Sequence, residues 1–567
     1  MFYRKSLKIF LCLSFCLVFI SLIAQSETIK TPAEESKYTQ YSQNEEIARF
    51  LSRIDNYSPE TTIQIIGKTK ETKNYKPKDL YFCIITEEAA GCPSELNREK
   101  PTFLLIASQH GNEQSAKEAA LLLIRDLAVG ELKPLLKRLN FLIIPQANPY
   151  GSQFDQRRNE QDLDLNRDHV KLESPEVKAI HRIFRTWMPE VTMDAHEKGE
   201  SYYKVSVGCV SNPNIHPTLQ KFSRDAVLAE VEKNLKKKGI TFQEYLVTQQ
   251  IGIDSSAGVR YRPEDQRSEE EMKRFSTTDL NDGRNSLGIY ETLSFIQEGA
   301  SRHDIQTLRE RTEWQYFGFR FLAESIAGQG EKINSLVREL RERLIEKAKV
   351  YAEQDLVHLR MKYARDEKEP EIVIKNFERS EIPIRGVLKV DKKAGDFLTR
   401  DDLVSYPYPS QYKVVEETVK NWFPNVEAIV SVPRPLGYII PASHQDVVET
   451  MLGHDIKIEI FTQDRPLEIE AYQISTVVPA KYDYLPPQRI DVEKKKLQTI
   501  VKRGDFYISC AQASANLISC LLEPQSQYGF IRYLKFNLIP EEGDIFPIFR
   551  FAEKKELPVI PYKSWKR

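Results

Sequence analysis

The feature that most constrains the fold is an alternation of apolar strands and amphipathic helices over the first 330 residues. Residues 102–107 form a continuous apolar run, the pattern of a strand buried on both faces of a sheet. Residues 115–127 follow as an amphipathic helix, and residues 141–144 as the next buried strand. The alternation predicts an α/β protein with a mixed sheet and helices on both faces. Further strands are expected at residues 63–66, 80–85, 191–195, 203–207 and 287–296, and further helices at residues 45–54, 173–187 and 217–238.

The second part of the chain has a different texture. Leu336, Leu340, Leu344 and Ala348 recur at every fourth residue, which predicts a charged helix over residues 332–364. Beyond it, short strands separated by Pro, Asp and Gly predict a β-rich region, with helices near residues 444–452 and 511–522. The resulting division is an α/β domain at residues 25–330, a helical connector at 331–368 and a β-rich accessory domain at 369–567.

The N-terminus has the character of a targeting segment. Arg4, Lys5 and Lys8 precede an almost purely apolar run at residues 9–24, which is short for a membrane span and ends in a polar pair. A signal peptide at residues 1–24 is therefore expected, with a retained membrane anchor as the alternative. The signal peptide predicts an exported protein, periplasmic or extracellular.

Charge and cysteine counts limit the function classes. The chain has 81 basic and 82 acidic residues, so a general nucleic-acid binder, which needs a basic face, is not expected. Five cysteines lie outside the N-terminal apolar run, and no Cys-x-x-Cys spacing occurs, which argues against a cysteine zinc cluster. Cys83 and Cys92 are close enough along the chain for a local bridge, and buried free thiols are the equal alternative.

A constellation of metal-binding side chains follows two of the predicted strands. His110 and Glu113 come just after the strand at residues 102–107, and His196 follows the strand at residues 191–195. In open α/β sheets, ligands bind at the carboxyl ends of the strands. Catalytic zinc needs three protein ligands and leaves its fourth position to water. His-x-x-Glu alone is a weak signal, but with His196 it predicts a site for one zinc ion.

Further polar groups occur in an order that suits hydrolysis. Arg157, Arg158, Asn166 and Arg167 lie in one loop, where guanidinium and amide groups can clamp a carboxylate. Taken alone, this loop would more often be a solvated surface. Water on zinc also needs a neighbouring base, and Glu291 and Glu298 near the last predicted strand of the α/β domain both qualify by position.

These pieces together resemble the zinc metallocarboxypeptidase family of the carboxypeptidase A type. The family pattern of His-x-x-Glu, Asn-Pro-x-Gly, Arg-Asn, Asp-x-Asn-Arg, Asp-x-His and a strand-borne Glu is met in order over residues 40–315, with Tyr150 in place of the usual Asp of Asn-Pro-Asp-Gly. The C-terminal part, at residues 434–441 and 522–526, resembles an extension of some bacterial exported members.

The resemblance implies a role for each site residue. His110, Glu113 and His196 would bind zinc, and Asp164 would orient His110. Arg158 would polarise the scissile carbonyl and stabilise the oxyanion. Asn166 and Arg167 would hold the substrate carboxylate. Glu298 would be the base, preferred to Glu291 because residues 285–289 resemble the run that precedes the base in bacterial relatives. The substrate-capping tyrosine of the family has no counterpart that a motif identifies.

The expected function is zinc-dependent release of C-terminal residues from peptides with a free carboxyl end. Two other readings are a metal-dependent deacylase or amidase on a related fold, and a non-catalytic peptide-binding protein. The intact set of metal and clamp residues speaks against the binding protein. The remaining histidines are expected to be structural or exposed: His169, His181, His216, His303, His358, His444 and His454.

Overall fold

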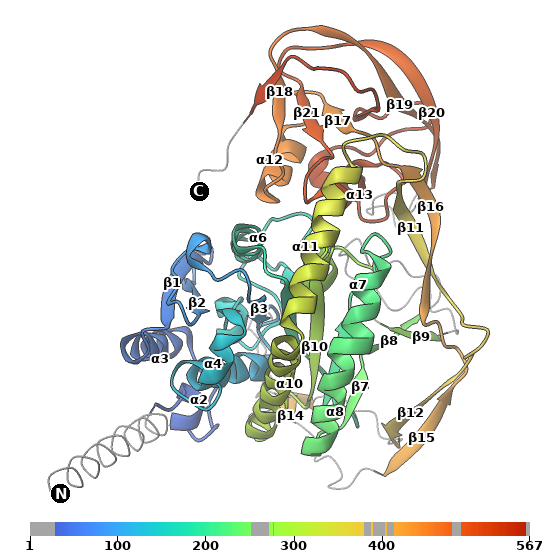
Figure 1. Ribbon diagram of the computed structural model, residues 1–567. Coiled ribbons are helices and arrows are strands. Elements are labelled where there is room, and N and C mark those ends of the chain that lie inside the picture. Colours follow the sequence, from blue (N-terminus) through green and yellow to red (C-terminus); the bar gives the residue numbers. More distant parts are fainter. Residues whose placement is uncertain are drawn as a thin grey trace, which may run out of the picture.

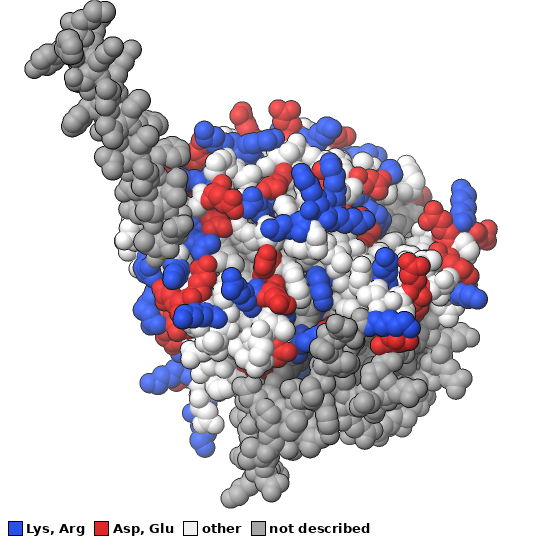
Figure 2. Space-filling model, turned by 90° about the horizontal axis from the view of Figure 1, so that it is seen from below, with Lys and Arg blue, Asp and Glu red and all other residues white. Residues whose placement is uncertain are grey.

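The computed structural model describes residues 29–250, 271–275, 277–378, 387–388, 403–404, 413–478 and 489–562. The predicted signal peptide at residues 1–24 lies outside these residues. Within the described ranges, no helix combines the length and the apolar composition that a membrane crossing requires. Lysine and arginine side chains alternate with acidic ones over the face seen in Figure 2.

An eight-stranded mixed sheet forms the centre of the first part of the chain (Figure 1). β3, β4, β5 and β10 run parallel to their neighbours in this group, whereas β1, β2 and β6 contribute antiparallel pairs. The order in the sheet is β1-β2-β4-β3-β5-β10-β6-β7. The strands are β1 (Thr61–Lys68), β2 (Asp79–Ile85), β3 (Thr102–Ala107), β4 (Asn140–Ile144), β5 (Val191–Gly199), β6 (Val205–Cys209), β7 (Phe242–Glu244) and β10 (Leu293–Ser301).

Helices cover both faces of this sheet, which confirms the predicted fold class. Successive residues of a strand point to opposite faces. Gln297 of β10 bonds to Gln315 of α10 (Leu308–Gly328), whereas its neighbour Ile296 faces the side on which α9 (Gly283–Gly288) lies. The other helices around the sheet are α3 (Asn44–Tyr57), α4 (Gln114–Ala128), α6 (Pro175–Trp187), α7 (Pro217–Phe222) and α8 (Ala229–Lys238), the last two joined by a π-helical segment (Ser223–Leu228).

Local sequence sets where these helices begin. The hydroxyl of Ser174 accepts a hydrogen bond from the backbone N–H of Val177, and Pro175 occupies the first turn of α6, both common at helix starts. Asp282 caps α9 in the same way, since its carboxylate accepts from the N–H of Asn285. The predicted strand at residues 287–296 was therefore too early: residues 287 and 288 close α9, and β10 starts at Leu293.

The helix predicted at residues 332–364 is also shorter in the structure. α11 (Gly330–Lys347) ends before residue 348, and β11 (Leu356–Ala364) follows as a strand that pairs with β16 (Asn425–Pro433). α11 packs on the central core through Ile333, Val337 and two leucines. The guanidinium of Arg341 donates to the backbone carbonyls of Met188, Pro189 and Tyr290. The predicted domain boundaries stay predictions, but α11 is closely tied to the α/β part.

The C-terminal region is β-rich, as predicted. Its main sheet has the order β20-β19-β22-β17-β21-β18-β23, and every pairing within it is antiparallel. Figure 1 shows this sheet beyond the upper end of α11. Its elements are β17 (Gly437–Ile440), α12 (Gln445–Gly453), β18 (Glu459–Phe461), β19 (Arg465–Val478), β20 (Arg489–Val501), β21 (Phe506–Ser509), α13 (Ala515–Leu522), β22 (Phe549–Phe551) and β23 (Val559–Pro561).

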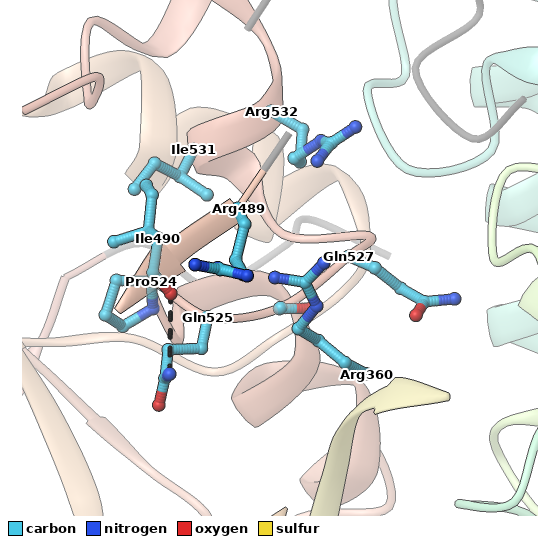
Figure 3. Close-up of a pocket in the computed structure, with 9 residues that line it drawn as sticks. Arg360, Arg489, Ile490, Pro524, Gln525, Gln527, Ile531 and Arg532 are labelled. Atoms are coloured by element: carbon cyan, nitrogen blue, oxygen red, sulfur yellow. Dashed lines mark hydrogen bonds between the residues drawn. The ribbon is translucent and has the colours of Figure 1, made fainter. Parts of the chain in front are cut away.

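Smaller strand pairs complete the described fold. They join β8 (Leu246–Gln250) to β9 (Glu271–Phe275), β12 (Ile372–Phe377) to β15 (Val414–Val419), and β13 (Val387–Leu388) to β14 (Leu403–Val404). A small hollow beside β20 is lined by Arg360, Arg489 and Arg532, with Gln525 donating to the carbonyl of Ile490 (Figure 3). Arg489 is paired with Asp491 at 3.1 Å.

The five described cysteines are all free thiols, so the suggested bridge between Cys83 and Cys92 is wrong. Cys83 lies buried in β2, whereas Cys92 is half-buried just before a short 3₁₀ turn (Pro93–Glu95). Buried Cys83, Cys209, Cys510 and Cys520 fit the alternative reading, in which the thiol behaves as a small apolar side chain.

Candidate active site

Three side chains from two strand ends converge at the edge of the central sheet. β3 ends at Ala107, and His110 and Glu113 lie in the turn that leads into α4, with Glu113 at its N-cap. His196 lies on the neighbouring strand β5, one residue beyond Ala195, the partner of Ala107. The Nδ1 atoms of His110 and His196 are 3.0 Å apart, and each lies 2.8 Å from an oxygen of Glu113. All three side chains are buried.

This donor set fits a zinc ion. Zinc binds imidazole nitrogen and carboxylate oxygen at about 2.0–2.2 Å, so one ion can reach three atoms that are this close together. The outer nitrogens of both imidazoles already have carboxylate partners. Nε2 of His110 lies 3.1 Å from Asp164, and Nε2 of His196 lies 2.8 Å from Asp194. These partners fix the tautomer that leaves both Nδ1 atoms free to bind metal.

Asp194 is in turn held by the buried side-chain amide of Gln109, which was not predicted to be part of the site. Nε2 of Gln109 donates to Asp194 over 2.8 Å, and its Oε1 lies 2.9 Å from Nε2 of His169. The Asp-x-His motif could have predicted the contact between Asp194 and His196, since alternate residues of a strand point to the same face. Gln109 carried no such signal, because its role depends on the contact between β5 and the turn after β3.

Glu298 lies beside His196. β10 runs between β5 and β6, and Glu298 pairs with His196 on one side and with Ser206 on the other. Paired residues of neighbouring strands point to the same face, so the Glu298 carboxylate shares a face with the metal-binding group. Burial raises the pKa of Glu298 above its usual range, and the side chain of Tyr245 bonds to it. A carboxylate with a raised pKa is suited to accept and return a proton.

Glu291, the other candidate base, lies at the opposite end of β10. It precedes the strand, and its carboxylate accepts a hydrogen bond from the backbone N–H of His216 over 3.0 Å. Seven residues of extended chain separate Glu291 from Glu298, roughly 20 Å or more. Glu291 is buried between the α/β part and Asn516 of α13, outside the group around His196.

The loop that precedes Asp164 presents a different arginine from the one expected. Nε of Arg157 donates to Asp164 over 2.9 Å, and its Nη1 lies 3.1 Å from Nδ1 of His110 and 3.6 Å from Glu113. Arg158 instead donates to the carbonyl of Asp162 and lies 3.7 Å from the carboxylate of the same residue. The two arginines are adjacent in an irregular loop, where sequence spacing does not indicate which side chain faces the site. The structure thus places Arg157, and not Arg158, beside the metal-binding group.

The predicted carboxylate-binding pair is divided between two positions. Asn166 is buried, its Oδ1 accepts from the N–H of Gly283 over 2.7 Å, and its Nδ2 lies 3.0 Å from Nε2 of His196. Arg167 is half-buried and close to acidic groups, chiefly Asp279, which raise its pKa although burial lowers it. The Asn166 amide is therefore engaged by groups of the protein itself. The neighbouring Arg167 guanidinium provides a positive charge that a substrate carboxylate could bind.

Among the described residues, no other histidine joins the metal-ligand group. His169, His181 and His454 form a buried cluster, in which Nδ1 of His169 is 3.0 Å from Nε2 of His181 and the rings of His181 and His454 are 5.1 Å apart. His454 also lies 3.0 Å from the carbonyl of Val170. In the described part of the chain, His110, Glu113 and His196 are the one group with metal-ligand geometry.

Comparison with known proteins relates part of the chain to a known family. Residues 47–281 match the model of the zinc carboxypeptidase family. All three residues of the metal-ligand group lie within this segment. The family match confirms the predicted hydrolase, and zinc is the metal that the family implies for the His–Glu–His group.

Two fungal proteins named carboxypeptidase 2 are similar to most of the chain. The protein from Trichophyton rubrum is 24% identical over 498 residues, covering 81% of this chain and 82% of its own length. The protein from Trichophyton tonsurans is 24% identical over 480 residues, covering 81% of this chain and 78% of its own. Among solved structures, a metallo-carboxypeptidase from Pseudomonas aeruginosa matches with a TM-score of 0.36 and 18% identity, covering 52% of this chain and 71% of its own.

Proposed function

We propose that this chain releases C-terminal residues from peptides with a free carboxyl end, using one zinc ion held by His110, Glu113 and His196. The observation that carries the proposal is a pair of imidazole nitrogens 3.0 Å apart, each 2.8 Å from one oxygen of Glu113, next to the strand position of Glu298. Peptides are the substrate class of the family. The arginines of the loop before α6 can bind the free carboxylate at the end of such a peptide.

Each residue of the site has a separate task in this proposal. Bound zinc supplies Lewis-acid polarisation of the scissile carbonyl and of the attacking water. Glu298 accepts the proton of that water and returns it to the leaving amine. Arg157 stabilises the negative charge on the carbonyl oxygen, in place of Arg158, because its guanidinium lies 3.1 Å from Nδ1 of His110.

Arg167 binds the carboxylate of the substrate in this scheme. Asn166 contributes by position, since its Oδ1 accepts from the N–H of Gly283 and its Nδ2 lies 3.0 Å from Nε2 of His196. Asp164 orients His110, and Asp194 does the same for His196. We also propose export through the N-terminal signal peptide, and an accessory role for the C-terminal region in forming one side of the site.

A release assay tests the proposal. Zinc-loaded full-length protein is incubated with unblocked peptides, and released amino acids are measured with and without a chelator. Release from the carboxyl end that stops with chelator is expected, and His196→Ala removes both activity and bound zinc. Hydrolysis of N-acyl amino acids alone would identify a deacylase instead. Tight peptide binding without any release, unaffected by Glu298→Gln, would identify a binding protein.

A further inference from the structure

The face that carries Glu298 has two successive rows of paired residues. We define the catalytic row as His196, Glu298 and Ser206, which pair across β5, β10 and β6. The floor row is the next set on the same face, Asp194, Ile296 and Gly208, which pair across the same strands. Two residues of a strand separate the rows by roughly 7 Å. The two rows are therefore close enough for one substrate residue to span the distance between them.

Arg284 of α9 covers the floor row. A Cβ atom on Gly208 would lie 2.9 Å from Nη1 of Arg284 and 3.1 Å from Cγ2 of Ile296, so the missing side chain at Gly208 makes room for the guanidinium. The same Cβ would lie 3.2 Å from Cβ of Tyr245, whose side chain bonds to Glu298. Arg284 is thus placed directly below the side chains of the catalytic row.

The guanidinium of Arg284 has unused donors. Its side chain is 1% exposed, and Nη2 donates to Asp282 over 2.8 Å. Nε and Nη1 have no hydrogen-bond partner among the described residues. Buried N–H groups on a charged side chain are unfavourable unless an acceptor reaches them. The acceptor that matches a guanidinium edge is a carboxylate.

We propose that Arg284 selects peptides whose C-terminal residue has an acidic side chain, Glu or Asp. This inference rests on the proposed function. The side-chain carboxylate binds the free edge of Arg284 at the floor row, while the main-chain carboxylate binds Arg167 beside the metal-binding group. An apolar side chain in the same place leaves the Arg284 donors unpaired, which gives strong discrimination.

The acidic groups near Arg284 do not favour a basic side chain instead. Asp282 is already bonded to Arg284 and to the N–H of Asn285. The carboxylate of Glu244 is held by Arg224 at 2.8–3.0 Å. A lysine or arginine side chain of a substrate would meet these carboxylates only by breaking existing ion pairs. Asp194 of the floor row is likewise held, by Gln109 at 2.8 Å and by Nε2 of His196 at 2.8 Å, so the free donors of Arg284 favour an anion.

The test compares peptides that differ only in the last residue. Zinc-loaded full-length protein is assayed with the same blocked peptide ending in Glu, Gln, Leu or Lys. We expect kcat/KM for Glu to exceed that for Gln by about tenfold or more, and this ratio to fall to about one in Arg284→Gln. The ratio is taken within one protein sample, so it does not depend on the fraction folded. Arg320→Gln, on the outer side of α10, is the matched control and keeps the wild-type ratio.

Two outcomes separate this inference from the proposed function. Release of Leu or Lys at least as fast as Glu by the wild type overturns the acidic selectivity and leaves the carboxypeptidase proposal intact. If no peptide is cleaved, the proposed function fails, and binding then tests Arg284. Calorimetry with Glu298→Gln should give at least about tenfold tighter binding of the Glu peptide than of the Gln peptide. Equal binding overturns the inference.

Discussion

Glu298 and His196 are direct partners on the adjacent parallel strands β10 and β5. The pairing fixes the distance between a buried carboxylate and a metal-binding imidazole through the backbone of the sheet. Neither side chain depends on a flexible loop for its position. The relationship therefore joins the proposed base and one proposed zinc ligand through a single sheet.

Substitution of Glu298 separates proton transfer from metal binding. Glu298→Gln is expected to lower kcat by about a thousandfold, because general-base catalysis contributes about 10²–10⁴. Metal analysis should still find wild-type zinc, since Glu298 is not among the three ligands. Glu291→Gln is the control at the other end of β10 and should keep wild-type kcat. A variant at Glu298 with near-normal turnover would remove it from the mechanism.

The two adjacent arginines offer a matched pair. Arg157→Gln is expected to lower kcat/KM by about a hundredfold, the effect of losing one oxyanion-stabilising group. Arg158→Gln should stay within about threefold of wild type, because exposed ion pairs such as Arg158–Asp162 contribute little. Steady-state kinetics on one peptide measures both. The reverse order of effects would restore Arg158 to the role first predicted for it.

Metal affinity depends on the partners of the imidazoles. Asp194→Asn weakens the acceptor 2.8 Å from Nε2 of His196, and zinc affinity is expected to fall about 10–100-fold. Competition with a chromophoric chelator measures this affinity without an activity assay. Asp162→Asn in the exposed loop is the control. Unchanged zinc affinity in the Asp194 variant would show that this carboxylate has only a structural role.

Glu291 makes the stability of the protein depend on pH. Burial raises its pKa to about 7 from an ordinary value of 4.5. A folded pKa above the unfolded one means that the stabilisation is fully present below pH 4.5 and is lost as pH rises through 7, about 3 kcal/mol in all. Glu291→Gln should therefore melt above wild type at pH 8 and gain less at pH 5. An equal shift at both pH values would contradict the buried-carboxylate account.

The histidine cluster gives the opposite dependence. Burial lowers the pKa of His169 and of His454 to about 4 from 6.5. The unfolded chain binds more protons than the folded one between pH 4 and 6.5, so stability is present above pH 6.5 and is lost as pH falls toward 4. His454→Gln should reduce the drop in melting temperature between pH 7 and pH 5. An unchanged drop would mean that His454 is protonated in the folded protein.

The sequence predicted the parts of this protein that depend on local pattern. The buried strand at residues 102–107 is the same in the structure, since five consecutive apolar residues after Thr102 leave few alternatives. His110, Glu113 and His196 were found because strand ends bring ligands together at one edge. The sequence could not predict which of Arg157 and Arg158 faces the metal-ligand group, because an irregular loop has no periodicity that assigns side chains to a face. The helix beyond residue 347 failed for a related reason: no Gly or Pro marks its end, and only the alternation in β11 shows the change.

The residues proposed to bind the substrate's C-terminal side chain could not be predicted from the sequence. Tyr245, Gly208 and Arg284 come from three separate segments, and their contact exists only in the folded sheet. Gly208 could be recognised as important only after the guanidinium above it was seen. Long-range packing of this kind produces specificity without a motif.

The segment before α9 is held by two phenols of the C-terminal region. The hydroxyl of Tyr528 lies 2.5 Å from that of Thr278, and Asn281 donates to the hydroxyl of Tyr533. Exchange of the C-terminal region between homologous enzymes would thus replace the two phenols that hold the segment before α9 and leave His110, Glu113 and His196 unchanged. We expect such chimeras to keep bound zinc and to change their preference for the C-terminal residue of the peptide.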